Sequence, residues 1–183
     1  MSLADESDES LMRRVRLGER EPMSVLVRRF ANQLLTFIRR LGVRPQAADE
    51  VFQEVFLAVW THRRSYQLKR NFKPWLLGIA TNKCRAAVRR SRRTVSIDSS
   101  PRWTGVGAAP VDDLIQTETL QLVELGVSRL PMKQREVVVM RMWNNMSYAE
   151  IAAALNRSES TIRTNMSFGL KILREFLEPR LRE

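Results

Sequence analysis

Hydrophobic side chains recur at helical spacing along the last quarter of the chain, and this periodicity limits the possible fold more than any other feature. The residues in question, separated by four, four, three and four positions, are Ile162, Met166, Leu170, Leu173 and Leu177. Such spacing places side chains on one face of an α-helix, so we expect this stripe to face inward. A shorter apolar series, Ile151, Ala152 and Leu155, predicts a second helix just before it.

The residues around these two helices predict how they begin and how they are joined. Ser147, followed three residues later by Glu150, is typical of a capping box at a helix N-terminus. Asn156 tolerates a left-handed backbone and favours a tight turn, and Ser158 is expected to cap the last helix. A helix pair with so short a turn is typical of a helix-turn-helix, whose second helix enters the DNA major groove.

The outward face of the last helix carries residue types that can contact DNA bases. Arginine can donate two hydrogen bonds to guanine, and hydroxyl groups adapt to several bases. The candidate reading residues are Ser160, Arg163, Thr164 and Ser167. The alternative from periodicity alone is an ordinary helical hairpin with a solvated polar face.

The rest of the chain is also helical in pattern, which predicts an all-α fold of two helical modules. Residues 1–93 contain apolar stripes for four helices, and residues 112–183 contain those for the helix-turn-helix and the helices before it. Between them, residues 94–111 are rich in Ser, Gly, Pro and Ala without any period, which indicates a flexible linker. Trp103 is unusual in such a spacer, and we expect that it can dock on a neighbouring surface.

The charge of the chain is concentrated in its first half. The net charge is +11, which implies a polyanionic partner. Residues 1–93 hold 20 Lys and Arg against 9 Asp and Glu, and residues 94–183 hold 11 against 11. The module with the helix-turn-helix is therefore neutral, which is not expected of a stand-alone repressor.

The sequence also indicates where the chain resides. No apolar run approaches the roughly 18 residues of a membrane helix, so no membrane insertion is expected. The polar, acidic start is unlike a signal peptide, and the single cysteine, Cys84, fits a reducing compartment. We therefore expect a cytoplasmic protein.

Three surfaces of the first module are candidates for binding. The first is an acidic face: Glu50, Gln53 and Glu54 lie on one side of a helix and could dock a basic partner, although acids are also favoured at any helix N-terminus. The second interleaves aromatic and basic residues, which is typical of surfaces that bind single-stranded nucleic acid. Its residues are Tyr66, Lys69, Arg70, Phe72, Lys73 and Trp75. Phe72 and Trp75 could instead belong to the core, and for Trp75 we favour that interpretation.

The third surface is an arginine-rich helix end. Arg85, Arg89, Arg92 and Arg93 lie near one helical face, where each phosphate neutralised would release counterions. A helix C-terminus alone favours cations, but with Arg90 there are five arginines with no acid between them, which exceeds that need. We find no pattern for a catalytic set, a metal site or a cofactor, since there is no phosphate-binding glycine loop and one histidine only.

With both modules considered together, the chain resembles the extracytoplasmic-function class of bacterial sigma factors over nearly its whole length. ADEVFQEVFLAVW at 48–60 resembles the region 2 helix that grips the polymerase β′ clamp. FKPWLLGIATNKCRAAVRR at 72–90 is similar to the following helix, which meets the melted −10 element. The segment 130–164 looks like region 4, which binds the −35 element and the β flap.

The resemblance implies a role for each surface. It assigns core polymerase binding to Glu50, Gln53 and Glu54. It places Asn82 and the preceding loop near the displaced −10 strand, so that the expected −10 contacts are Tyr66, Lys69, Arg70, Asn71, Lys73, Asn82, Arg85 and Arg89. Arg163 matches a usual DNA-contacting position, and Gly169 replaces a usual alanine, which would loosen that turn by about 1 kcal/mol if it were exposed.

The implied function is a non-enzymatic promoter-specificity subunit without cofactors. Its implied partners are core RNA polymerase, promoter DNA and an anti-sigma factor. The alternative is a free-standing helix-turn-helix regulator that binds duplex DNA without polymerase.

Overall fold

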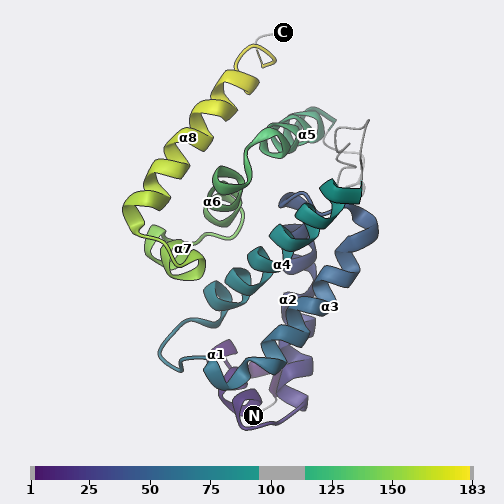
Figure 1. The fold of residues 1–183 in the computed structure, drawn as a ribbon, viewed down its shortest axis with the longest axis vertical. Helices are drawn as coiled ribbons and strands as arrows, with labels where there is room; N and C mark the ends of the chain where they lie inside the picture. Colours follow the sequence, from purple (N-terminus) through teal and green to yellow (C-terminus); the bar gives the residue numbers. More distant parts are fainter. Residues whose placement is uncertain (1–2, 95–113, 182–183) are drawn as a thin grey trace.

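The protein is all-α, as the sequence predicts. A computed structural model describes residues 3–94 and 114–181, and the expected linker, with Trp103, lies outside them apart from residue 94. Within the described residues there are helices and no strand (Figure 1). The elements are η1 (Leu3–Asp5), α1 (Asp8–Arg16), α2 (Glu21–Arg40), α3 (Pro45–Thr61), η2 (Arg63–Ser65), α4 (Phe72–Thr94), α5 (Leu114–Arg129), α6 (Met132–Met142), α7 (Tyr148–Leu155) and α8 (Glu159–Leu177).

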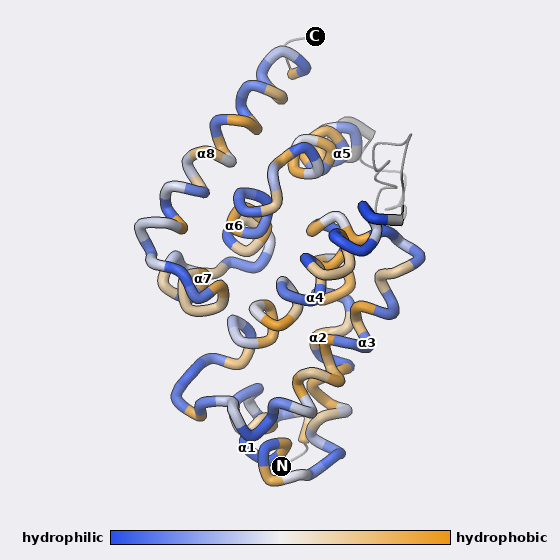
Figure 2. The backbone as a smooth tube through the Cα atoms, in the orientation of Figure 1, coloured by the Kyte–Doolittle hydropathy of each residue, from blue (hydrophilic) through white to orange (hydrophobic). Residues whose placement is uncertain are grey.

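The N-terminal module, α1 to α4, packs around one apolar core. Helix α1 begins at the N-cap Ser7, whose side chain accepts a hydrogen bond from the backbone N–H of Ser10. Gly42 follows α2 with φ of +88°, a left-handed conformation that glycine adopts without strain. The apolar faces of the helices turn toward one another (Figure 2), and large side chains such as Phe37 and Leu76 are fully buried there.

An aromatic cluster fixes the start of α4. The Tyr66 and Phe72 ring centroids lie 6.2 Å apart, and those of Tyr66 and Trp75 lie 5.1 Å apart. Tyr66 is 1% exposed, and its hydroxyl donates to the carbonyl oxygen of Arg70. The carboxylate of Glu9 accepts from the backbone N–H of Phe72 at 3.0 Å, so α1 caps α4 and closes the loop between residues 66 and 71.

The C-terminal module, α5 to α8, contains the predicted helix-turn-helix. Ser147 and Glu150 form the expected capping box, and Asn156 has the left-handed conformation expected at the turn, with φ of +50°. The side chain of Ser158 accepts from the backbone N–H of Thr161 and caps α8. Four consecutive apolar residues, Val137 to Met140, are helical and buried within α6.

The expected inward stripe of α8 is partly wrong. Leu170 is 46% exposed, and the buried residues are Ile162, Met166, Gly169, Leu173 and Phe176. Gly169 is thus buried rather than exposed, and a Cβ added to it would lie 2.8 Å from a methyl group of Val138. The absence of a side chain allows α6 and α8 to cross closely, and this close crossing rotates the buried stripe away from Leu170.

The two modules pack against each other, an arrangement that the sequence did not predict. Helix α4 of the first module packs against the short helix α7 of the second (Figure 1). A Cβ added to Gly78 in α4 would come within 2.5 Å of the carbonyl oxygen of Ala154 in α7, so this glycine permits the close contact. At the other end of the interface, Arg40 pairs with Glu124 at 3.0 Å and stacks on Trp143.

Candidate nucleic-acid interface

The four candidate reading residues of α8 are all exposed to solvent. Ser160, Arg163, Thr164 and Ser167 lie on the first turns of the helix, beyond the Ser158 cap. The hydroxyl of Thr164 donates to the carbonyl oxygen of Ser160 at 2.9 Å, which leaves the threonine methyl and oxygen lone pairs for a partner. Arg163 is the one cation among these four residues, so the affinity of this face for a duplex depends on few phosphate contacts.

Arg163 is held in place without being buried. Its guanidinium lies 4.5 Å from the ring centroid of Tyr148 in α7 and 3.4 Å from Glu159 one turn earlier. The side chain remains 61% exposed, so its donors can turn to a base edge. Stacking on an aromatic ring restricts a long side chain, which reduces the entropy lost when it binds.

The acidic face of α3 divides into free and engaged residues. Glu50 and Gln53 are exposed. Glu54 instead lies 3.4 Å from Lys83 and 3.5 Å from Arg90 of α4. Glu50 and Gln53 can therefore meet a partner directly, whereas Glu54 also ties α3 to α4.

The candidate single-strand surface is a basic loop followed by one face of α4. Lys69, Arg70 and Asn71 are exposed in the loop, and Asn82 and Arg89 are exposed on the helix. Tyr66 does not belong to this surface, because its ring is buried and cannot stack on a base. Desolvation by burial, with smaller contributions from Glu9 and Asp8, raises the pKa of Tyr66 to about 12. Trp75 packs against the core, as we favoured from the sequence.

Three residues of the candidate single-strand surface are engaged by the C-terminal module. Lys73 donates to the carbonyl oxygen of Asn144 at 2.8 Å, and Asn71 donates to Glu150 at 3.1 Å. Arg85 donates from two nitrogens to the two carboxylate oxygens of Glu136, both at 2.5 Å.

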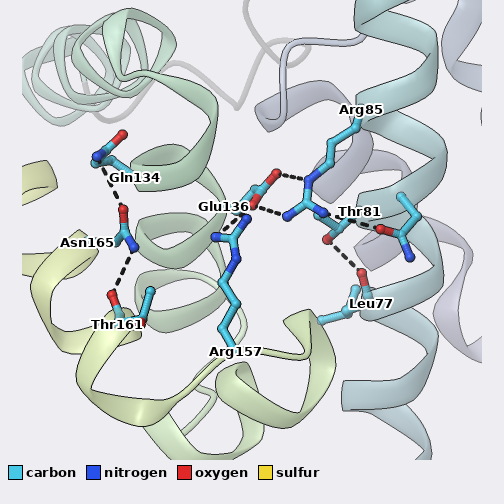
Figure 3. A network of polar contacts seen from close by, with 9 residues as sticks. Leu77, Thr81, Arg85, Gln134, Glu136, Arg157, Thr161 and Asn165 are labelled. Carbon is cyan, nitrogen blue, oxygen red and sulfur yellow. Dashed lines mark hydrogen bonds and ion pairs between the residues drawn. The ribbon is translucent and has the colours of Figure 1, made fainter.

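Glu136 lies at the centre of this contact. Its side chain is 0% exposed, and Arg157 at the turn before α8 lies 3.7 Å away. Figure 3 shows the carboxylate between the two guanidinium groups, one from each module. The carboxylate raises the pKa of Arg85, chiefly through the hydrogen bonds it accepts.

Sequence reasoning missed the two buried polar residues of this interface. Glu136 precedes four buried apolar residues in α6, so its burial follows no helical period. Asn144 is 4% exposed; its side chain donates to the carbonyl oxygen of Val139 and accepts from Gln33 of α2 at 3.0 Å. An acidic residue among buried positions indicates that its carboxylate pairs with a cation. The sequence does not identify that cation, because Arg85 is 51 residues away.

The surroundings of Cys84 and His62, the remaining side chains with reactive groups, indicate a structural role. Cys84 is buried, and desolvation, followed by the charge of Glu136, raises the pKa of its thiol, which makes it unreactive. The ring Nδ1 of His62 lies 2.9 Å from the carbonyl oxygen of Ala58, one turn earlier in the helix. In the described part of the chain there is no cluster of His, Cys, Asp and Glu suited to a metal ion, and no helix there is long and apolar enough to span a membrane.

The two modules match two models of one protein family. The model described as Sigma-70 region 2 matches residues 26–94, and the model described as Sigma-70, region 4 matches residues 120–173. The first match lies almost wholly in the half that carries the positive charge, and the second lies in the neutral half.

Relatives resemble the chain over almost its full length. The RNA polymerase sigma factor CarQ from Myxococcus xanthus is 29% identical, covering 91% of this chain and 95% of its own. The ECF RNA polymerase sigma-E factor of Escherichia coli (strain K12) is 25% identical, covering 96% and 97%. The ECF RNA polymerase sigma factor SigW from Bacillus subtilis (strain 168) is 23% identical, covering 91% and 94%.

Two solved structures share the fold. CnrH in complex with the cytosolic domain of CnrY superposes with a TM-score of 0.72 at 24% identity, covering 95% of this chain and 99% of that one. The sigma factor RpoE in complex with the anti-sigma factor NepR from Bartonella quintana gives a TM-score of 0.68 at 23% identity, covering 83% and 94%.

Proposed function

The chain belongs to the extracytoplasmic-function class of the sigma-70 family of RNA polymerase sigma factors, and from this premise we propose how its modules divide the recognition of a promoter. The N-terminal module, residues 1–93, docks on core polymerase and holds the unpaired −10 strand. The C-terminal module, residues 112–183, reads the −35 duplex and contacts the β flap, and residues 94–111 connect the two. The protein acts in the cytoplasm and supplies specificity rather than catalysis.

The observation that carries this division is the distribution of positive charge. The exposed cations of the loop and of α4, including Lys69, Arg70 and Arg89, supply a field that attracts the DNA backbone. The reading face of α8 offers Arg163 alone among its four candidate residues. The C-terminal module therefore binds the −35 duplex weakly by itself. Its base preference affects promoter choice when polymerase and the N-terminal module supply the remaining affinity.

The −10 contacts in this proposal are Lys69, Arg70, Asn71, Lys73, Asn82, Arg85 and Arg89. Tyr66 shapes the loop from inside instead of stacking on a base, because its ring is buried. The −35 contacts are Ser160, Arg163, Thr164 and Ser167.

Glu50 and Gln53 dock on the β′ clamp in this proposal, and Glu54 supports them. Because Glu54 also pairs with α4, its removal would disturb the module as well as the docking face. The clean test is the double change Glu50→Ala and Gln53→Ala in the full chain, with Gln46→Ala on the exposed first turn of α3 as the control.

We expect the double variant to bind purified core polymerase at least about tenfold more weakly than the control, a loss of about 1.4 kcal/mol. Binding of the same full chain to a −35 duplex is expected to stay unchanged. An equal loss in both assays would indicate misfolding, and unchanged polymerase binding would remove the α3 face from the proposal.

An anti-sigma partner is also part of the proposal. The CnrH and RpoE structures have this fold and were determined with protein partners. A partner of that kind would hold this chain inactive until a signal releases it. A free-standing regulator that binds duplex DNA without polymerase is not favoured, since the relatives along the whole chain are named as RNA polymerase sigma factors.

A further inference from the structure

We infer that Glu9 of α1 is a positioning residue for the −10 strand, because its carboxylate holds the loop between Tyr66 and Phe72 in the shape that presents its polar side chains to DNA. This inference rests on the proposed function for the assignment of the loop to the −10 strand. Glu9 lies 63 residues before Phe72 in the sequence, so the contact follows from the fold and not from any local pattern.

Hydrogen bonds fix the backbone of this loop at its middle and at its end. The N–H of Arg70 donates to the carbonyl oxygen of Gln67 at 2.9 Å, and the carbonyl oxygen of Arg70 accepts from the hydroxyl of Tyr66. The N–H of Phe72 donates to the carboxylate of Glu9 at 3.0 Å. Of these bonds, the one to Glu9 ties the loop to a distant part of the chain.

Helix α1 is a firm support for that contact. It packs against η2 and α4, the elements on either side of the loop, and its side chains Leu11 and Val15 are fully buried. Asp8, next to Glu9, pairs with Arg29 of α2, which fixes the first turn of α1 on the module. The carboxylate therefore meets the loop from a fixed direction, and a loop held in this way loses less conformational entropy when a strand binds.

The contact also affects where the side chain of Asn71 points. Asn71 directly precedes α4, and an asparagine in that position usually accepts hydrogen bonds from the first N–H groups of the helix. Here its amide donates away from the helix, to Glu150 at 3.1 Å, while Glu9 supplies an acceptor for α4. Because Pro74 in the first turn has no N–H, Glu9 meets much of the demand for a cap and leaves Asn71 available to a DNA strand.

Two substitutions of Glu9 separate the hydrogen bond from the charge. Glu9→Gln keeps an oxygen that can accept from Phe72, whereas Glu9→Ala removes both the acceptor and the charge. Glu21→Ala, which removes an exposed acid at the start of α2, is the control for the loss of a negative charge. If the freed loop in Glu9→Ala keeps its binding shape in about one molecule in ten, the apparent affinity for the strand falls about tenfold.

The first measurement is amide hydrogen exchange in the full-length protein, read on the peptide that covers the loop and the first turn of α4. We expect this peptide to exchange faster in Glu9→Ala than in the parent. Glu9→Gln and Glu21→Ala should exchange as the parent does. Unchanged protection in Glu9→Ala would overturn the inference, because the carboxylate would then hold no part of the loop in place.

The second measurement is binding of single strands to polymerase assembled with each full-length variant. The probes are the strand that the parent holoenzyme, but not core polymerase alone, enriches most from a random DNA pool, and a scrambled strand of the same composition. We expect Glu9→Ala to bind the enriched strand about tenfold more weakly and to lose much less affinity for the scrambled strand. Glu9→Gln should recover the parent's affinity. An equal loss on both strands would show that Glu9 contributes to stability alone.

Asn71→Ala tests the route by which Glu9 acts. In the parent background this change should weaken binding of the enriched strand. In the Glu9→Ala background it should weaken binding much less, since Asn71 is then drawn toward the helix end. Fully additive losses would contradict the coupling between the two residues.

The inference and the proposed function fail in different ways. A parent holoenzyme that enriches no strand over core polymerase would contradict the proposed −10 surface and this inference with it. A parent that selects strands, together with a Glu9→Ala variant that selects them equally well, would refute the role of Glu9 alone.

Discussion

Replacing Arg163 with alanine is expected to remove discrimination at one −35 base pair while leaving the protein folded. The side chain is 61% exposed, and its pair with Glu159 spans 3.4 Å between two exposed groups, which is worth a few tenths of a kcal/mol. Its stacking on Tyr148 adds about 0.5–1 kcal/mol. The expected loss of folding stability is therefore about 1 kcal/mol, too small to unfold a typical domain.

The expected loss at the promoter is larger. A two-pronged contact with guanine is worth about 1–3 kcal/mol of discrimination, and this corresponds to about 5- to 140-fold in relative affinity. The assay is fluorescence anisotropy of polymerase assembled with the full chain, on promoters in which each −35 base pair is changed in turn. Lys171→Ala, an exposed cation on the same helix, is the matched control.

Arg163→Ala should lose its preference at one position and keep it at the others. A preference profile identical to that of the parent would exclude Arg163 from the reading set. A uniform loss on every promoter, with the profile unchanged, would refute a base contact and indicate a phosphate contact instead.

Three further outcomes are expected. Gly169→Ala should lower the stability of the C-terminal module by up to about 2 kcal/mol in urea unfolding, because overpacking against the Val138 methyl at 2.8 Å outweighs the gain in helix propensity; stabilisation would refute the close crossing. The N–H of Ser147 lowers the pKa of Glu150 below 4.5, so its contribution to stability is present above that pH and is lost as pH falls. Glu150→Gln should therefore make the melting temperature depend less on pH between about pH 3 and 5. A dependence as steep as that of the parent would count against the cap. Arg89→Ala should reduce the slope of log affinity against log salt by about 0.7 on a single strand, and an unchanged slope would show that Arg89 meets no phosphate.

Local features of the fold were predictable because short stretches of sequence determine them. The capping box at Ser147 and Glu150, the left-handed turn at Asn156 and the cap at Ser158 each depend on residues within one turn of a helix. From these features the helix-turn-helix could be located in the sequence, together with the outward face of its second helix.

The features that could not be predicted depend on which surfaces meet. The buried stripe of α8 contains Gly169 instead of Leu170, because α6 crosses closest at the glycine. Tyr66 is a residue type that can stack on a base, but its ring is buried in the aromatic cluster. Glu136 and Asn144 are buried by contacts with distant helices, and no spacing within α6 or its loop encodes those contacts.

The central claim, that this chain directs polymerase to a promoter, is tested most directly by run-off transcription with purified core polymerase. The account predicts transcripts from a cognate promoter only when the full-length protein is added, and their loss when either the −10 or the −35 element is scrambled. Tight binding of the protein alone to a duplex operator, without initiation on any promoter in a random-sequence library, would contradict it.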